Sequence, residues 1–371
     1  MDYQKWLDSV TEKIISKELK VIERNPDIIP YRSDENGRFR GTRPTWWTNG
    51  FWGGMLWQLH HVTKDQRFAD AANLLEKKMD ANLWDWFHMD HDSGFKWLPT
   101  SVLNHRLTGS EESKNRAMLA ADNLASRFNP VGKFIRAWNG GEYPTERLGW
   151  AIIDCMMNLP LLHWAAEQTG DPRYTQIAMM HADTTMEHFV RADGSVKHIV
   201  MFDPYTGEYL GSRGGQGYAE GSSWTRGQAW AIYGFTLSYL HTQKQEYLDC
   251  AKRVANYFIA NTPEDYLIPA DFRQPAEPHR EDNSAALIAA CGMLELCKLC
   301  EEADGAIYRK AAVNMLQAVT EKRVDWSHDT DALVLHCAGS YHNLYDISLI
   351  YADYYLIEAI WKLNGTDLFI W

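Results

Sequence analysis

A helix–short turn–helix unit recurs along the chain, and this repeat constrains the fold more than any other feature. Five short turns resemble one another, and each follows an apolar helical stretch and precedes an amphipathic one. Asp or Ser in such a turn caps the incoming helix, and Pro172 suits a first helical turn. Self-similarity of this kind indicates an architecture built from one repeated unit. The turns lie at 63–68, 108–110, 169–174, 242–247 and 302–308.

The repeated helices fall into two sets. One set is apolar nearly all round, which predicts burial; its members begin near residues 47, 93, 147, 223, 282 and 344. The other set has one polar face, which predicts an outer layer; it covers 3–24, 65–82, 110–128, 171–193, 244–262 and 304–322. Six buried and six amphipathic helices in alternation predict an all-α fold, an (α/α)6 barrel that forms a single domain over residues 1–371. Strand patterning is sparse and predicts one hairpin, at 196–201 and 207–210.

The connections between the helices are asymmetric. Turns from an inner to an outer helix take about two to four residues, whereas most returns to an inner helix are much longer. Long ordered loops in a compact domain are usually functional, and these loops all emerge where the inner helices begin. We therefore expect one site at one end of the barrel. The long connections lie at 25–46, 129–146, 194–222, 263–281 and 323–343, and polar-aromatic clusters lie at 45–52, 88–97, 134–141 and 214–230.

Composition excludes several classes of function. The 37 Lys and Arg against 49 Asp and Glu give a net charge of −12, which argues against nucleic-acid binding. No apolar run is long enough for a membrane span, and the N-terminal segment lacks the apolar core of a signal peptide. The six Cys show no disulfide-scaffold spacing, and Cys297 and Cys300 are interpreted as two thiols on one helix face rather than a metal site. We expect a cytoplasmic protein.

Sixteen Trp in 371 residues are an unusual share. A Trp ring covers a large area with few rotatable bonds, so it serves either as core filler or as a platform for a flat ligand such as a sugar ring. Most of the rings are expected in the core. Six lie at the predicted loop end and are candidates for stacking on sugars: Trp46, Trp47, Trp52, Trp138, Trp224 and Trp230.

Asp154 is the most informative single residue. It lies among apolar neighbours with no cationic residue within one helical turn. A carboxyl buried without a cation has a raised pKa and stays protonated near neutrality, as a general acid requires. Asn158, four residues on and on the same helix face, is a candidate to orient it. The alternative is that Asp154 hydrogen-bonds a backbone group inside the core, and a kink at Pro160 fits both interpretations.

Asp92 is the candidate for a second carboxylate, because glycosidic chemistry uses a pair. It also stands where a helix N-cap is expected, before Ser93, and the two roles are compatible. Residue types that can bind a metal lie nearby, at His88, Asp90 and His91. Their spacing matches no zinc signature, so no metal is expected.

Two further polar residues lie in the loop clusters. Arg226 is the only basic residue in 215–230, which makes it a candidate to hold a substrate carboxylate in a bidentate manner; the alternative is a structural Arg–Asp pair. His198 begins the predicted hairpin, and its default interpretation is a surface histidine. The chain has no phosphate loop, no dinucleotide fingerprint and no serine nucleophile elbow, so no cofactor is expected.

With these residues the chain resembles glycoside hydrolase family 88, the unsaturated glucuronyl hydrolases. The resemblance implies an (α/α)6 barrel that acts on oligosaccharides left by polysaccharide lyases, whose non-reducing end is a 4,5-unsaturated uronic acid. It also implies hydration of a vinyl ether, in which an acid protonates C4, water adds at C5, and the hemiketal opens and expels the remaining sugar. The blocks that carry the resemblance are WTNGFWGGMLW (47–57), HDSGF (91–95), IIDCMMNLPLLHWAAEQTGDP (152–172), FDP (202–204), WTRGQAWAIYGF (224–235) and ADYYLIEAI (352–360).

The same resemblance implies residue roles. Asp154 matches the general acid/base of the family and Asp92 the second, ionised carboxylate. His342 matches a position near the leaving sugar. The implied partner is a small anionic unsaturated oligosaccharide, bound by a monomer or homodimer without metal or cofactor. The residues implied to bind substrate are Trp47, His91, Trp138, His198, Gln216, Arg226, Trp230 and His342.

Two regions depart from the family pattern. The segment after His342 is shorter, without an evident sulfate-recognition motif, and residues 139–149 also differ. Both are expected to border the leaving sugar, so chondroitin- or hyaluronan-type, heparin-type and xanthan- or gellan-type fragments remain open as substrates. Three other functions also remain open: an unsaturated rhamnogalacturonyl hydrolase, a sugar epimerase with paired histidines, and a non-catalytic sugar-binding barrel.

Overall fold

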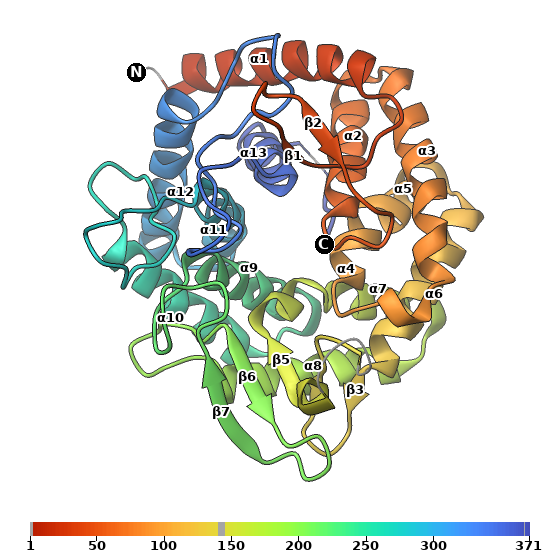
Figure 1. Cartoon of the computed structure of the whole chain (residues 1–371), viewed down its shortest axis with the longest axis vertical. Helices are drawn as coiled ribbons and strands as arrows, with labels where there is room; N and C mark the ends of the chain where they lie inside the picture. The colour runs from red at the N-terminus through yellow and green to blue at the C-terminus, as the bar shows by residue number, and fades with distance from the viewer. Residues whose placement is uncertain (1–2, 140–144, 367) are drawn as a thin grey trace.

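The inner helices close into a ring. The computed structural model describes residues 3–139, 145–366 and 368–371. Each inner helix packs on the next and α13 packs on α2, which confirms the predicted (α/α)6 barrel (Figure 1). The ring consists of α2 (Asn49–Thr63), α4 (Ser93–Trp97) continued by the π-helical η2 (Leu98–Val102) and α5 (Leu103–Thr108), α7 (Pro160–Thr169), α9 (Thr225–Thr242), α11 (Asn283–Leu296) and α13 (Ile350–Leu363).

The outer helices each cover one inner helix. Their amphipathic sequences explain this position: α10, for example, buries Tyr247, Ala251 and Phe258 on the side that packs against α9. The expected caps are present, because Asp65 and Asp171 each accept a hydrogen bond from a backbone N–H of the first turn. The outer set comprises α1 (Tyr3–Arg24), α3 (Gln66–Leu83), α6 (Glu111–Ser126), α8 (Pro172–His188), α10 (Gln245–Asn261) and α12 (Glu302–Lys322).

Aromatic rings fill the middle of the barrel. Phe95 packs on Trp230 with ring centroids 4.9 Å apart, and Tyr355 packs on Trp230 at 5.6 Å. Trp371 stacks on Tyr355 and donates from its indole N–H to Glu358. Every residue of α11 is buried, as the all-round apolar pattern predicted. The barrel is therefore a packed core, and a ligand site can form only at its ends.

The third inner helix begins later than predicted. The prediction placed its start near residue 147, but the chain there forms η3 (Thr145–Gly149), β5 (Trp150–Ile152) and the 3-10 turn η4 (Ile153–Met157) before α7. The backbone of β5 is extended because it pairs with β6, and α7 then begins at a proline, which needs no N–H partner. The sixth inner helix also begins later, at Ile350 rather than near 344.

Short strands lie at the end of the barrel that carries the long loops. The predicted hairpin is present as β6 (Ile199–Phe202) and β7 (Tyr209–Arg213), and β5 joins it as a third antiparallel strand (Figure 1). The sequence did not predict the other strands. These are the pairs β1 (Pro30–Ser33) with β2 (Phe39–Gly41) and β3 (Phe128–Asn129) with β4 (Phe134–Ile135); the short helices η1 (Trp86–His88) and η5 (Cys297–Leu299) complete the described elements.

All six cysteines are free thiols. Within the described residues, no helix combines the length and the apolar character that crossing a bilayer requires.

Candidate active site

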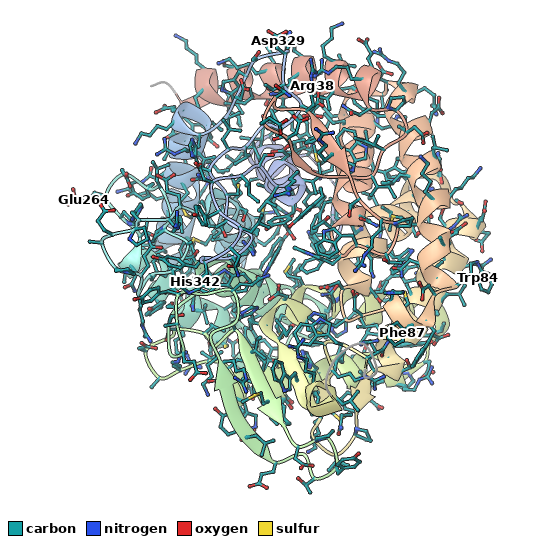
Figure 2. The ribbon with its side chains drawn as sticks, viewed as in Figure 1. Arg38, Trp84, Phe87, Glu264, Asp329 and His342 are labelled. Atoms are coloured by element: carbon teal, nitrogen blue, oxygen red, sulfur yellow. The ribbon has the colours of Figure 1, made fainter. Side chains whose placement is uncertain are left out.

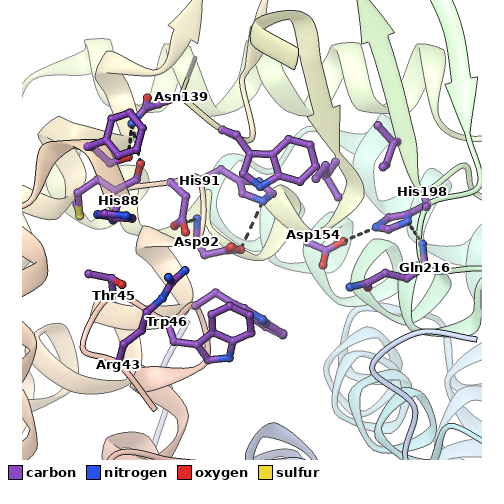
Figure 3. A pocket seen from close by; sticks show the side chains of 18 residues that line it. Arg43, Thr45, Trp46, His88, His91, Asp92, Asn139, Asp154, His198 and Gln216 are labelled. Atoms are coloured by element: carbon purple, nitrogen blue, oxygen red, sulfur yellow. Dashed lines mark hydrogen bonds and ion pairs between the residues drawn. The ribbon is translucent and has the colours of Figure 1, made fainter. Parts of the chain in front are cut away.

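A cavity of about 340 Å³ opens at the end of the barrel where the inner helices begin. Four of the six connections that lead into inner helices supply its walls, as expected for one site at one end (Figure 3). The lining residues are Arg43, Thr45, Trp46, Trp47, Phe87, His88, Met89, Asp90, His91, Asp92, Trp138, Asn139, Ile152, Asp154, His198, Ile199, Gly215 and Gln216.

Two carboxyl groups face each other across this cavity (Figure 3). The side chains of Asp92 and Asp154 are 14% and 16% exposed, so both lie near its base. Asp154 does not lie on a regular α-helix; it stands on η4, directly after the strand β5. The pairing of β5 with β6 therefore fixes Asp154 relative to His198, which immediately precedes β6.

His198 directs a ring nitrogen at Asp154. Nδ1 of His198 lies 3.3 Å from the carbonyl oxygen of Gly214 and 2.9 Å from the backbone N of Gln216. We assign the shorter contact as the hydrogen bond, in which the Gln216 N–H donates to Nδ1, and this assignment places the proton of the neutral ring on Nε2. Nε2 lies 3.9 Å from Oδ1 of Asp154, an oxygen that is buried without a hydrogen-bond partner. Burial lowers the pKa of His198 to about 3, which keeps the ring neutral. The ring thus presents an N–H toward the carboxyl group without adding a charge.

The loop 214–217 needs glycine in order to hold this histidine. Gly215 has a φ of +59°, and a Cβ at this position would lie 2.0 Å from Nδ1 of His198. Only a residue without a side chain lets the backbone pass so close to the imidazole. The Gly-rich loop at 214–217 therefore positions the ring of His198.

Asn158 serves Asp92 rather than the side chain of Asp154. Its Oδ1 accepts from the N–H of Phe95 at 2.7 Å, which is the bond that an N-cap side chain usually accepts in the first turn of α4. Asp92 stands at that N-cap position but makes no capping bond. The Asn158 amide favours the ionised form of Asp92 by lowering its pKa, and its Nδ2 donates to the backbone carbonyl of Asp154 at 3.3 Å. With the cap supplied from another loop, the carboxyl group of Asp92 is left to face the cavity.

Burial raises the pKa of both carboxyl groups. The pKa of Asp154 rises to about 6, first because the group is buried and second because Asp92 carries a like charge. The pKa of Asp92 also lies well above its usual value, through burial and the charge of Asp90. Asp92 and Asp154 therefore influence each other's protonation. Two adjacent carboxyls of this kind lose their protons in coupled steps, and the pair retains a proton where ordinary carboxyls are ionised.

A buried polar network supports Asp92 from behind. Lys96 is fully buried and donates to Asn82 at 2.9 Å and to Asp90 at 3.1 Å, which neutralises the carboxylate of Asp90. His91 lies with its Nε2 3.6 Å from Asp92, and burial lowers its pKa to about 4, so it is neutral. Among the residues that the structure describes, no group of three or more His, Cys, Asp or Glu has a geometry that could hold a metal ion.

Comparison with known proteins identifies the family. The sequence profile of Glycosyl Hydrolase Family 88 matches residues 20–258. The chain is 37% identical over 348 residues to an unsaturated glucuronyl hydrolase of Bacillus sp. (strain GL1), with 91% of each chain covered. The chain belongs to glycoside hydrolase family 88. It is accordingly a glycosidase, and the carboxyl pair at the base of the cavity is the chemistry that this class uses.

Other relatives match nearly the whole chain. An unsaturated chondroitin disaccharide hydrolase of Streptococcus agalactiae is 34% identical over 364 residues, covering 94% of this chain and 90% of the relative. The solved structure of the Bacillus sp. GL1 enzyme superposes with a TM-score of 0.88 at 33% identity, covering 95% of this chain and 96% of that one. A structure of an unsaturated glucuronyl hydrolase specific for heparin gives a TM-score of 0.89 at 29% identity, with 99% of both chains covered.

Seven of the ten site residues named from the sequence line the cavity. They come from four connections that are far apart in the chain, yet the barrel brings them together at one end. Arg226, Trp230 and His342 are not in the lining. The seven are Trp47, His91, Asp92, Trp138, Asp154, His198 and Gln216.

Only half of the tryptophans expected to stack on sugars reach the cavity. Trp46, Trp47 and Trp138 line it and are partly exposed. The other three are buried: Trp52, Trp224 and Trp230 have 1%, 3% and 0% of their surface exposed. Sequence position placed all six near the loops, but the side chains of these three point into the core or under the loops.

Arg226 is placed differently from the prediction. Its guanidinium is buried, lies 2.6 Å from the carboxylate of Asp282 and donates to the carbonyls of Ala338 and Gly339. The alternative of a structural Arg–Asp pair is therefore the one that the structure shows. A further hydrogen bond links Arg226 to the cavity, because its Nη2 donates to Oε1 of Gln216 at 3.1 Å. Arg226 thus holds Gln216 in place and does not itself line the cavity.

Trp230 is buried and His342 is exposed. Trp230 packs against Phe95 beneath the cavity floor, whereas His342 is exposed on the loop that leads to α13. Nε2 of His342 lies 2.7 Å from the carbonyl oxygen of Tyr218. Figure 2 shows His342 and Phe87, which does line the cavity, on opposite sides of the ring.

The sequence reasoning named neither Asn139 nor Arg43, two cavity residues that carry polar groups. Asn139 is buried and its amide donates to the carbonyls of Trp86, Phe87 and Met89, so it joins two of the lining loops. Arg43 lies three residues before Trp46 and also lines the cavity. The signal for Arg43 was available, because it is a cation beside aromatic residues in a long loop.

Proposed function

We propose that this chain removes a 4,5-unsaturated uronic acid from the non-reducing end of short oligosaccharides produced by polysaccharide lyases. The observation that carries the proposal is the carboxyl group of Asp154, whose pKa is raised to about 6 in a cavity lined by aromatic rings. A vinyl ether must receive a proton on carbon, and a carboxyl group that stays protonated near neutrality can supply it. Relatives named unsaturated glucuronyl hydrolase and unsaturated chondroitin disaccharide hydrolase support the same chemistry.

The reaction balances with one molecule of water. Asp154 transfers its proton to C4, and the positive charge that develops at C5 and the ring oxygen is met by water, which adds at C5. The Asp154 carboxylate then accepts a proton from that water and is restored. The hemiketal formed at C5 opens to a ketone and leaves the former ring oxygen as a hydroxyl on C1. This hemiacetal collapses to an aldehyde as the bond from C1 to the remaining sugar breaks, and the hydroxyl proton passes to the departing oxygen, which leaves as an alcohol. No electrons are transferred, so no redox cofactor is required.

Neighbouring residues are assigned supporting roles. The Nε2–H of His198 orients Asp154, whose Oδ1 lies 3.9 Å away. Asp92, supported by Asn158, is placed to bind sugar hydroxyls and to stabilise the positive charge. The rings of Trp47 and Trp138 provide stacking surfaces for the two sugars. Gln216 contacts the reacting sugar, and Arg226 keeps its amide in position.

The test is release of the unsaturated sugar, followed as loss of its ultraviolet absorbance with a panel of lyase-generated disaccharides and mass detection of products. Asp154→Asn is expected to lower kcat by a factor of at least about 1,000, because it removes the proton donor. Asp70→Asn, an exposed change on the outer helix α3, is the matched control and is expected to behave as wild type. Turnover by folded Asp154→Asn at the wild-type rate would reject this residue as the acid.

We also propose the setting in which the enzyme works. The ring of six inner helices carries the catalytic cavity at one end, which supports a single catalytic domain over residues 1–371. Six free thiols support the cytoplasm as its compartment. We propose a monomer or homodimer, to be distinguished by sedimentation of the purified chain.

A further inference from the structure

Arg43 is a cation without a charged partner at the mouth of the cavity. It is exposed, and its guanidinium carbon lies 5.5 Å from the ring centroid of Trp46. Among the described residues, it is the only Arg or Lys that lines the cavity, and its side chain forms no ion pair or hydrogen bond there. Figure 3 shows its side chain extending into the space between Trp46 and His88.

Three other cations near the cavity already have partners. Lys96 is bound to Asp90, and Arg226 is bound to Asp282. Arg127 donates to Asn139 and to the carbonyls of Met89 and Ala137. Arg43 is thus placed to meet an anion that a ligand brings into the cavity, and stacking on Trp46 restricts its side chain before the ligand arrives.

The position of Arg43 indicates which part of the substrate it meets. Figure 3 places it at the end of the cavity away from Asp154, His198 and Gln216. The reacting sugar must lie beside Asp154, because the proton transfer takes place there. The mouth, where Arg43 is exposed, is then the region that the next sugar occupies.

We propose that Arg43 is a specificity-determining residue that binds an anionic substituent, a sulfate ester or a carboxylate, on the sugar that follows the scissile bond. Guanidinium donors match either group in a bidentate geometry. The inference rests on the function proposed above and adds to it a preference for a leaving sugar that carries a negative charge. It also supplies an anion contact in a chain whose segment after His342 carries no evident motif for sulfate.

The experiment compares pairs of unsaturated disaccharides that differ only in the leaving sugar: unsulfated N-acetylgalactosamine, its 4-sulfate, its 6-sulfate, and a leaving uronate. Steady-state kinetics are measured for wild type and Arg43→Ala. For the best anionic substrate, Arg43→Ala is expected to lower kcat/KM about ten- to a hundred-fold, mainly through KM, because the contact is present before and during the reaction. For the unsulfated substrate, the change is expected to stay within about threefold. The four substrates also distinguish a sulfate from a carboxylate as the preferred group.

Two further variants separate contact from general charge. Arg43→Lys keeps the charge but loses the planar fork, and is expected to retain part of the preference. Arg213→Ala removes an exposed arginine that lies 5.4 Å over the Trp150 ring and does not line the cavity, so it is expected to leave the preference unchanged.

Three outcomes would overturn the assignment of Arg43. The first is that Arg43→Ala lowers kcat/KM equally on charged and uncharged substrates, which would place its contact on the reacting uronate. The second is that Arg213→Ala changes the preference as much as Arg43→Ala does, and the third is that the wild-type enzyme shows no preference for anionic leaving sugars. The failure of the proposed function itself is a different result, namely no turnover of any unsaturated disaccharide by wild type.

Discussion

Replacement of Gly215 by alanine tests whether the loop that holds His198 matters for catalysis. The new Cβ would lie 2.0 Å from Nδ1 of His198, whereas ordinary van der Waals contact begins near 3.4 Å, so the ring must retreat by about 1.4 Å. This movement breaks the bond from the Gln216 N–H and displaces Nε2 from Asp154. Because a misplacement of about 1 Å in a catalytic group can cost about a hundred-fold in rate, kcat is expected to fall by about that factor.

The same substitution also has a cost in stability that can be worked out separately. Gly215 has a positive φ of 59°, and an alanine in that region costs about 1–2 kcal/mol. Loss of the buried hydrogen bond to His198 adds about 1–3 kcal/mol. Gly170→Ala is the matched control: Gly170 has a φ of +72° at the end of α7, and a Cβ there meets no atom within 4 Å. The control carries the backbone strain without the clash.

The assay combines two measurements on the three proteins. Unfolding in urea gives the free energy of unfolding, and loss of ultraviolet absorbance with an unsaturated disaccharide gives kcat and KM. Gly170→Ala is expected to lose about 1–2 kcal/mol of stability with unchanged kcat, and Gly215→Ala to lose more stability and about a hundred-fold in kcat. If Gly215→Ala were folded and turned over at the wild-type rate, the placement of His198 would have no part in the reaction.

Two other predictions follow from burial. Because burial raises the pKa of Asp154 to about 6, its acid form dominates below that pH, and kcat/KM is expected to fall about tenfold per pH unit above it; a profile that is flat from pH 6 to pH 8 would contradict this. Arg226→Met leaves the carboxylate of Asp282 buried without its cation, and is expected to reduce the free energy of unfolding by about 3–5 kcal/mol in urea titrations. The double variant with Asp282→Leu is expected to recover part of this loss.

The sequence predicted the barrel because the relevant signals are local. The apolar face of a helix, the cap before it and the length of the following loop can all be read within about 20 residues. Asp154 was found in the same way, since the absence of a nearby cation is visible in the sequence. The start of the third inner helix was wrong because β5 is extended only through its pairing with β6, which lies some 50 residues later.

The roles of Arg226 and Asn158 depended on distant partners. Arg226 pairs with Asp282, 56 residues away, and Asn158 caps Phe95, 63 residues away. Neither partner can be identified from local sequence, so Arg226 was interpreted as a candidate ligand contact with an Arg–Asp pair as the alternative. The unpaired state of Arg43 was hidden for the same reason, because a residue is known to lack a partner only when its neighbours in space are known.

The charges around the cavity explain how an anionic sugar can enter an acidic site. Asp90, Asp92 and Asp154 all line it, and three ionised carboxylates would repel a uronate. Lys96 compensates Asp90, and the raised pKa values of Asp92 and Asp154 keep at least one proton on the pair. The burial that makes Asp154 an acid thus also removes much of the repulsion toward the substrate. When the pH rises and the pair loses its last proton, the proton donor and the tolerance for an anionic ligand are lost together, so KM is expected to rise as kcat falls.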